Sequence, residues 1–308
     1  MIPEEVRKLL EKQQYRIIGN HSAVKICHWT KQSLVRNRVC YKQKWYGIQS
    51  HRCMEFTPSV IWCTQHCLFC WRIQSGDRGL KWKEYPFPFK GDDPREILEK
   101  AIEARKQLLS GFKGNKNVTL KKWEEAIKPT NVAISLSGEP TLYPRLSELI
   151  EVAHEMGLKT FLVSNGTLPE AIEKLENLPW QFYITVAAPD KETYLKTCRP
   201  LLKDGWERLN KSLEIFSNLD CRRVIRLTLV KGLNLKDPEK YAELILKANP
   251  NFVEAKGFMH VGEAQKRLPR EAMPRFEDIK EFAEKLAEYS GYKIAGMDLD
   301  SVVVLLKK

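Results

Sequence analysis

Three cysteines stand close together in the sequence, since Cys63, Cys67 and Cys70 follow the spacing Cys-x3-Cys-x2-Cys. Thiolates this close can bind a metal ion or an iron–sulfur cluster. A four-iron cluster normally takes four cysteines, so three leave one iron open for a substrate or cofactor, as in an open catalytic metal site. A zinc site completed by His66 or by a distant cysteine is the alternative that the spacing leaves open.

A second cysteine triplet precedes the first. Cys27, Cys40 and Cys53 are separated by two equal intervals of twelve residues. Three unrelated buried thiols are the alternative, because a free cysteine packs like a small apolar residue. The equal intervals, placed ahead of the Cys-x3-Cys-x2-Cys motif, favour a second three-thiolate site. Two further cysteines, Cys198 and Cys221, stand alone, and the sequence assigns them no role.

The second triplet lies in a basic segment. No acidic residue occurs from Lys12 to Met54, whereas nine Lys or Arg do, in a chain of 308 residues with a formal net charge of +12. Aromatic residues are interleaved with these charges: Tyr15, Trp29, Tyr41, Trp45 and Tyr46. This composition favours a nucleic acid as partner, because cations neutralise phosphates and rings stack on bases. A basic solvated face is the alternative.

The chain carries no sequence signal for a membrane or for export. No apolar run approaches the ~20 residues that span a bilayer, and the residues from Met1 to Glu5 lack the basic-then-apolar order of a signal peptide. We therefore expect a cytoplasmic protein without a membrane contact. In that reducing compartment, eight cysteines favour metal or cluster binding over disulfides.

Strand-like and helical segments alternate and must position the cysteines. The predicted strands are 60–62, 132–136, 160–163, 182–186, 224–230, 252–259 and 302–306. The predicted helices are 4–13, 94–109 with Asp93 as N-cap, 146–156, a short one after Pro169, 206–216, 239–248 and 276–289. This order predicts an α/β fold with a parallel sheet covered by helices, as a full or partial (β/α) barrel or a doubly wound sheet. Its chemistry is expected at the C-terminal ends of the strands.

The segment from Cys63 to Cys70, with Phe69 just before the third cysteine, resembles the signature of the radical S-adenosylmethionine family. The resemblance implies a full or partial (β/α) barrel and a [4Fe-4S] cluster whose open iron binds the methionine part of S-adenosylmethionine. Segments at two later strand ends also match. These implied cofactor-binding residues are Ser137, Gly138, Glu139 and Pro140, which meet the methionine amino group in the family, and Ser164 and Asn165, which lie near the nucleoside.

With the twelve-spaced triplet, nearly the whole chain is similar to the tRNA 4-demethylwyosine synthases in their archaeal form. That similarity includes Ser135 to Pro144, Asp204 to Arg208 and Lys256 to Met259. It implies a radical enzyme that condenses N1-methylguanosine at position 37, beside the anticodon of tRNA(Phe), with pyruvate to form the tricyclic base. A second [4Fe-4S] cluster on Cys27, Cys40 and Cys53 would hold pyruvate.

The resemblance also implies roles for single residues and for partners. Lys42 aligns with a lysine proposed to form a Schiff base with pyruvate, and a contact to phosphate or to the pyruvate carboxylate is its alternative role. The flavodoxin-like domain of eukaryotic members is not found here, so an external electron donor is expected, as is a monomer. Trp29, Trp45, Trp71 and Trp82 are candidates for stacking on bases of the anticodon loop.

We predict an N-terminal basic extension, residues 1–58, that carries the second iron–sulfur site, and a radical barrel over residues 59–308. Two other functions remain open from sequence. The first is a radical enzyme that acts on a different substrate. The second is a non-catalytic RNA-binding protein in which His28, His51 or His66 complete two structural zinc sites.

Overall fold

The computed structural model describes residues 1–308, and the chain divides into two compact units. The first unit comprises Met1–Trp62, Arg78–Leu162 and Glu176–Trp180, and the second comprises Cys63–Asp77, Val163–Leu175 and Gln181–Lys308. The division into functional domains at residue 58 stays a prediction. No helix is long and apolar enough to cross a membrane.

The first unit is a five-stranded sheet in the order β1-β2-β3-β4-β5 with helices packed on it. Its strands are β1 (Arg16–Ile18), β2 (Ser22–Lys25), β3 (Cys53–Thr57), β4 (Asn131–Ile134) and β5 (Lys159–Ser164), the last two residues of which belong to the second unit. The pairs β1/β2 and β2/β3 are antiparallel, whereas β3, β4 and β5 run parallel.

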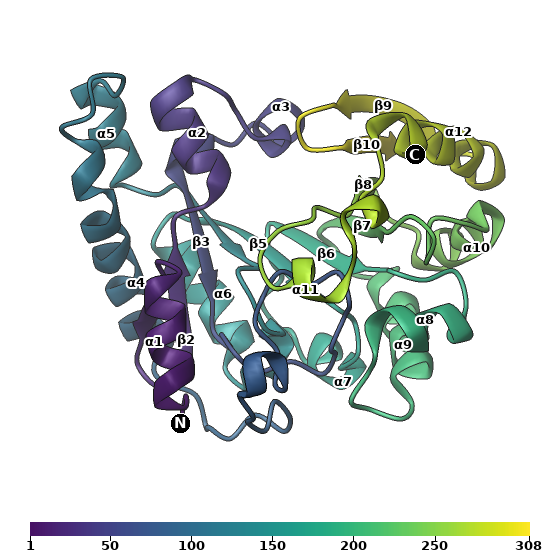
Figure 1. Cartoon of the computed structure of the whole chain (residues 1–308), viewed down its shortest axis with the longest axis horizontal. Coiled ribbons are helices and arrows are strands. Elements are labelled where there is room, and N and C mark those ends of the chain that lie inside the picture. Colours follow the sequence, from purple (N-terminus) through teal and green to yellow (C-terminus); the bar gives the residue numbers. More distant parts are fainter. The chain divides into compact units, whose positions relative to one another are not determined.

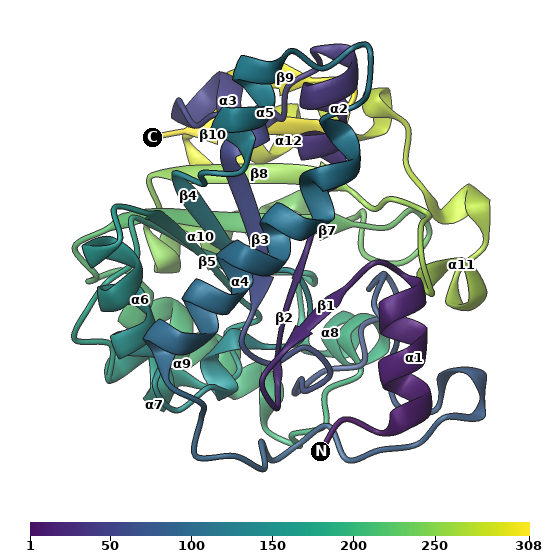
Figure 2. The ribbon, with the colours of Figure 1, turned by 90° about the vertical axis from the view of Figure 1, so that its left-hand side faces the viewer.

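Helices of the first unit carry or support the basic segment. They are α1 (Glu4–Lys12), α2 (His28–Arg36), α3 (Tyr41–Tyr46), α4 (Pro94–Leu109), α5 (Leu120–Ala126) and α6 (Leu146–Glu155). Helix α4 crosses the face of the sheet over β2 and β3 (Figure 2). Its start follows the expected rule, because the Asp93 carboxylate accepts a hydrogen bond from the Glu96 backbone N–H at 3.0 Å and Pro94 begins the helix.

The second unit is also a sheet covered by helices, in the strand order β6-β7-β8-β10-β9. Its strands are β6 (Gln181–Thr185), β7 (Arg222–Leu229), β8 (Phe252–Gly257), β9 (Lys293–Asp298) and β10 (Val303–Lys307). Strands β6, β7 and β8 run parallel, and β10 lies antiparallel to both β8 and β9.

The helices of the second unit complete the alternation. They are α7 (Pro169–Glu173), α8 (Lys191–Cys198), α9 (Gly205–Phe216), α10 (Pro238–Ala248), the short α11 (Ala264–Arg267) and α12 (Phe276–Ser290). Helix α10 packs against both α9 and α12 (Figure 1). The parallel strands with intervening helices confirm the predicted α/β class, and every predicted helix is present within two residues of its expected ends.

One predicted strand is wrong. Residues 60–62 form a turn closed by the Trp62 N–H, which donates to the Ser59 carbonyl at 3.0 Å. The strand lies upstream, as β3, and contains the half-buried Glu55 within an otherwise apolar stretch. The run at 60–62 is apolar because the turn is buried, with Trp62 only 2% exposed. Burial alone cannot distinguish a short strand from a packed turn.

The basic segment contains elements that the sequence did not reveal. These are the hairpin β1–β2, α2 and α3, in addition to α5, α8, α11 and β9 elsewhere. The hydrophobic period of α2 and α3 is weak because each spans only two turns or so and exposes polar side chains, for example Arg36 and Lys44.

Candidate metal centres

The first cysteine triplet lies on a loop that a neighbouring segment of the second unit holds in place. The backbone N–H groups of His66 and Leu68 donate to the carbonyls of Arg199 and Thr197, at 3.2 and 3.0 Å. In the other direction, the Leu201 N–H donates to the Thr64 carbonyl at 2.8 Å. The part of this loop from Thr64 to Leu68 is therefore paired with residues 197–201, at the end of α8 and just after it.

Side chains hold the backbone carbonyls of this loop. The buried Arg72 guanidinium donates to the Gln65 carbonyl at 2.9 Å, and Gln74 donates to the Cys67 carbonyl at 2.9 Å. Arg267, from α11, donates to the carbonyls of Cys70, Leu68 (3.4 Å) and Arg72 (3.2 Å). Its charge is balanced by Asp77, whose carboxylate lies 2.6 Å away. A loop with so many fixed carbonyls holds its thiols in one arrangement.

The three thiols of this loop meet specific neighbours. The Asn165 amide nitrogen lies 3.7 Å from the Cys63 sulfur and donates to the Thr64 hydroxyl at 2.9 Å. A hydrogen bond with the buried Cys198 thiol, together with burial, raises the pKa of Cys67, against the effect of Arg72. Burial likewise raises the pKa of Cys70. Such thiols stay protonated until a metal displaces their protons.

The second triplet is assembled from three separate elements of the first unit. Cys27 is the N-cap of α2, Cys40 is the N-cap of α3, and Cys53 opens β3. Neither cap makes a side-chain capping bond. Burial raises the pKa of Cys27, and neighbouring Glu55, Cys53 and Cys40 raise it further, which places the three sulfurs within electrostatic range of one another.

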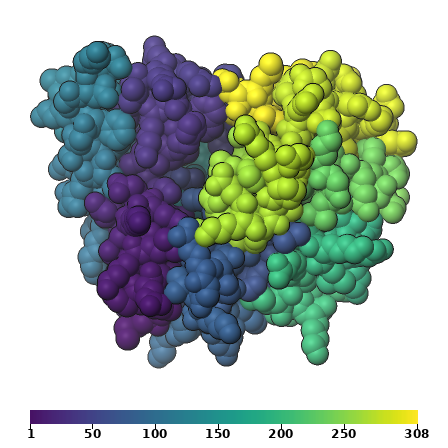
Figure 3. All heavy atoms as spheres, in the orientation of Figure 1, coloured from purple at the N-terminus to yellow at the C-terminus, as the bar shows by residue number.

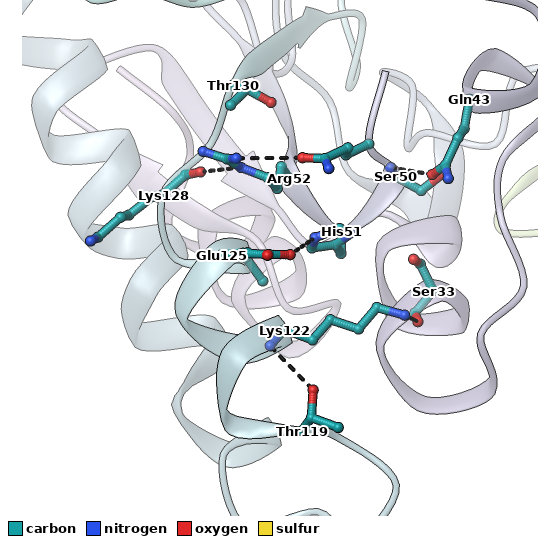
Figure 4. A network of polar contacts seen from close by, with 12 residues as sticks. Ser33, Gln43, Ser50, His51, Arg52, Thr119, Lys122, Glu125, Lys128 and Thr130 are labelled. Atoms are coloured by element: carbon teal, nitrogen blue, oxygen red, sulfur yellow. Dashed lines mark hydrogen bonds and ion pairs between the residues drawn. The ribbon is translucent and has the colours of Figure 1, made fainter. Parts of the chain in front are cut away.

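Polar contacts fix the backbone between these three elements. The Ser50 hydroxyl accepts from the Cys40 N–H at 2.9 Å, and Gln43 accepts from the Ser50 N–H at 2.8 Å. Thr30 donates to the Ser50 carbonyl at 3.0 Å. His51 is joined to Glu125 of α5 at 2.8 Å (Figure 4). The two intervals of twelve residues thus contain α2, α3 and the segments that connect these helices to the next cysteine.

Two lysines and one carboxylate lie close to the second triplet. Burial raises the pKa of Glu55 to about 7, and the charges of Lys25 and Lys42 lower it. Burial also raises the pKa of Cys53 to about 12, and Lys42 opposes that effect. The Lys42 ammonium lies 4.8 Å from the centre of the Phe161 ring. The predicted residue Lys42 and the predicted triplet are therefore brought together in the structure.

A buried arginine also belongs to the surroundings of the second triplet. Arg105 of α4 is 1% exposed and donates to the carbonyls of His51 (2.8 Å), Cys53 (3.2 Å) and Ala126. Burial lowers its pKa to about 10, and Cys53 and Cys27 are the groups that raise it. No carboxylate pairs with this guanidinium, and its Nε atom has no hydrogen-bond partner.

The residues from Ser137 to Pro140 form a tight turn in the first unit after β4. Glu139 is 2% exposed, and its carboxylate accepts from the hydroxyl and the backbone N–H of Thr141 at 2.6 and 3.1 Å. Gly138 has a φ of +70°, and a Cβ there would lie 1.8 Å from the Ser59 carbonyl oxygen. Only glycine fits, which explains the turn independently of any ligand. Ser164 is buried and accepts from the Gly166 N–H at 3.0 Å.

The surroundings of both triplets suit an anionic cluster. No three His, Cys, Asp or Glu side chains form a group that could hold one metal ion. A four-iron cluster is larger, and each thiolate binds a different iron at its corners. Three thiolates and a [4Fe-4S]²⁺ core carry a net charge of about −1. Cations suited to that charge lie beside each triplet: Arg72 and Arg267 at the first, and Lys25, Lys42 and Arg105 at the second.

The four tryptophans proposed to stack on bases are all half-buried. Trp29 lies against the Arg38 guanidinium, 5.7 Å from its ring centre, and Trp45 packs on Tyr41 with ring centres 5.0 Å apart. Trp82 donates to the Ile61 carbonyl at 3.0 Å, and the Trp71 carbonyl accepts from the Glu263 N–H. Their role in binding RNA stays a prediction.

Comparison with protein families agrees with this geometry. Residues 58–245 match the Radical SAM superfamily, and residues 247–308 match the family described as wyosine base formation. The fold and the cysteine loop thus define a radical S-adenosylmethionine protein, which implies a [4Fe-4S] cluster and S-adenosylmethionine as cofactors.

Relatives make the assignment more specific. The chain is 50% identical to the S-adenosyl-L-methionine-dependent tRNA 4-demethylwyosine synthase of Pyrococcus horikoshii, over 100% of this chain and 90% of that protein. It is 44% identical to that of Methanocaldococcus jannaschii, over 100% and 97%. A solved "Structure of TYW1 with a lysine-pyruvate adduct bound" is 42% identical, with a TM-score of 0.88 over 100% and 96%. The chain belongs to the tRNA 4-demethylwyosine synthase family.

The sequence alone indicates no role for three residues that lie beside the triplets, Arg105, Arg267 and Cys198. Arg105 and Arg267 are separated in the chain from the carbonyls of Cys53 and Cys70 by 52 and 197 residues. Of the three residues, only Cys198 could be singled out from the sequence, because it is an unassigned cysteine before Arg199 and Pro200. An arginine in a basic chain carries no such signal, because only the fold shows that it is buried.

Proposed function

We propose that this protein is an S-adenosylmethionine-dependent enzyme that condenses N1-methylguanosine at position 37 of tRNA(Phe) with pyruvate to form 4-demethylwyosine. The observation that carries this proposal is full-length identity of 50% to a synthase of that name. A cysteine loop whose backbone is held in place and a second triplet beside a lysine support it.

The radical chemistry is assigned to the first triplet. Cys63, Cys67 and Cys70 would hold the [4Fe-4S] cluster, which when bound supplies the electron that splits S-adenosylmethionine. Arg72, Gln74 and Arg267 keep the loop in one arrangement through its carbonyls. Ser137 to Pro140, Ser164 and Asn165 are proposed to bind S-adenosylmethionine. The buried Glu139 carboxylate suits the methionine ammonium group.

The second triplet is assigned to pyruvate. Cys27, Cys40 and Cys53 would hold a second [4Fe-4S] cluster. Lys25 and Lys42, close to this triplet, suit a carboxylate substrate. Holding pyruvate near the methylated base would contribute mainly by positioning.

Lys42 is proposed to form a Schiff base with pyruvate. Its amine would attack the C2 carbonyl, and loss of water would leave an imine between the lysine nitrogen and that carbon. The lysine-pyruvate adduct in a 42% identical relative supports this role over a purely electrostatic contact. The Phe161 ring, 4.8 Å from the ammonium, limits the positions of the lysine side chain.

Borohydride trapping tests the role of Lys42. With [¹⁴C]pyruvate and cyanoborohydride, the wild-type chain should gain one reduced adduct, and Lys42→Arg should gain none. Lys44→Arg is the matched control, because Lys44 is two residues away and exposed. A Lys42→Arg variant that still retains label would remove the Schiff-base role and leave only a contact to the carboxylate.

The partners follow from the same reaction. The basic segment from Lys12 to Met54 is proposed to bind the anticodon arm. We further propose a monomeric, cytoplasmic enzyme that receives electrons from a separate protein. Anaerobic incubation with dithionite, S-adenosylmethionine, pyruvate and N1-methylguanosine-containing tRNA(Phe) should yield 4-demethylwyosine by mass spectrometry. Formation of 5′-deoxyadenosine with unchanged tRNA would indicate a different substrate.

A further inference from the structure

Arg105 is a buried cation without a balancing anion in the protein. Its guanidinium is 1% exposed and touches only the carbonyls of His51, Cys53 and Ala126. Carbonyl dipoles stabilise a guanidinium, but they do not neutralise its charge. Burying an unpaired charge is among the most costly arrangements in a folded protein.

The second triplet lies directly beside this charge. Arg105 donates to the carbonyl of Cys53, one of the three cysteines of this triplet, at 3.2 Å. Protonated cysteine thiols carry no charge. They become anionic when they bind iron.

The arginine beside the first triplet shows what a balanced arrangement looks like. Arg267 also donates to the carbonyl of the third cysteine, Cys70, but it forms an ion pair with Asp77 at 2.6 Å. Arg267 is therefore neutralised within the protein, whereas Arg105 is not.

We infer that Arg105 is the counter-charge of the second iron–sulfur cluster, a positioning residue whose buried guanidinium is balanced by the anionic cluster on Cys27, Cys40 and Cys53. The inference rests on the second cluster of the proposed function. It predicts that retention of this cluster depends on a positive charge at residue 105, and less on the individual hydrogen bonds that arginine makes.

Two substitutions separate charge from hydrogen bonding. Arg105→Lys keeps the charge and loses the planar donor set, while Arg105→Gln keeps amide donors and loses the charge. Arg95→Gln on the same helix, at an exposed residue paired with Glu155, is the matched control. Iron and acid-labile sulfide are measured per chain after anaerobic reconstitution and gel filtration in EDTA, alongside the thermal unfolding of each apo-protein.

Wild type, Arg95→Gln and Arg105→Lys should each retain about eight irons, and Arg105→Gln about four. After one-electron reduction with dithionite, the remaining cluster should still change its electron paramagnetic resonance signal when S-adenosylmethionine is added. Equal iron retention by Arg105→Lys and Arg105→Gln, at eight or at four, would refute a role of charge. Loss of iron in Arg105→Gln together with an unfolded apo-protein would also refute it. A wild-type chain with only four irons would instead refute the second cluster itself.

Discussion

The two cysteine triplets are built in opposite ways. Cys63, Cys67 and Cys70 occupy one short loop, which backbone pairing to residues after α8 and the side chains of Arg72 and Arg267 hold in place. Cys27, Cys40 and Cys53 come from two helix N-termini and a strand start, and their proximity depends on the packing of α2, α3 and β3.

This difference indicates what each centre depends on for its stability. The loop carries its own framework, and its arginine Arg267 has a carboxylate partner. The dispersed triplet lies beside an arginine that has no carboxylate partner, since Arg105 donates its hydrogen bonds only to carbonyls. We therefore expect the first site to be shaped before any cluster binds, and the second to depend on the cluster for its charge balance.

The largest effect is expected at the framework of the loop. Arg267→Met should destabilise the apo-protein by about 2–3 kcal/mol, because it leaves the partly buried Asp77 without its ion-pair partner and the carbonyls of Cys70 and Arg72 without this donor. The segment that carries Arg267 reaches the surface of the second unit, yellow-green in Figure 3. Urea unfolding of the apo-protein measures the effect.

Arg270→Met, three residues along the same segment at an exposed position, is the control for Arg267→Met. It should change the free energy of unfolding by less than about 0.5 kcal/mol. Equal unfolding free energies for Arg267→Met and wild type would contradict a loop that is held before the cluster binds.

A smaller effect is expected from Cys198, which forms a hydrogen bond with the Cys67 thiol. Cys198→Ala should cost about 1 kcal/mol of apo-protein stability, and Cys198→Ser should recover part of it, since a hydroxyl oxygen can also accept from the Cys67 thiol. Release of iron to a chelator should be faster from Cys198→Ala than from wild type. Cys221→Ala, at the isolated cysteine before β7, is the control, and equal release rates in both variants would remove the role of Cys198.

The smallest effect concerns a support of the unit that carries the dispersed triplet. The buried His21 donates from Nδ1 to the Pro58 carbonyl (2.6 Å) and accepts at Nε2 from the Asp92 N–H (2.9 Å), among the rings of Phe87 and Tyr143. Burial lowers its pKa below the ordinary value of 6.5, although Asp92 opposes the shift. The neutral ring is the form that the fold favours.

Stability should therefore be complete above pH 6.5 and decrease as the pH falls below that value, because protonation then occurs more readily in the unfolded chain. Between pH 7.5 and 5.5 the melting temperature of the wild type should fall more than that of His21→Gln, which cannot take up this proton. Parallel curves for the two proteins would contradict a neutral His21.

The contrast between the triplets also explains what the sequence could predict. A loop motif is recognisable in the sequence because the close spacing of its cysteines is enough to bring their thiols together. The alternation of apolar strands with helices such as 94–109 and 276–289 follows from local periodicity. Lys42 was predicted through its alignment with a family lysine, and the structure places it close to Cys53.

The supports could not be predicted for the opposite reason. Arg105 and Arg267 are ordinary members of amphipathic or basic segments until the fold buries them, and the turn at 60–62 is as apolar as a strand. The hairpin β1–β2 and helices α2 and α3 are short and depend on tertiary packing for their stability.

The central claim is that the two differently built triplets each hold a four-iron cluster. The direct measurement is iron and acid-labile sulfide per chain in anaerobically purified protein, in wild type and in a variant with Cys27, Cys40 and Cys53 all changed to Ala. We predict about eight irons in the wild type and about four in the variant. About four irons in both proteins, or zinc in place of iron, would contradict the claim.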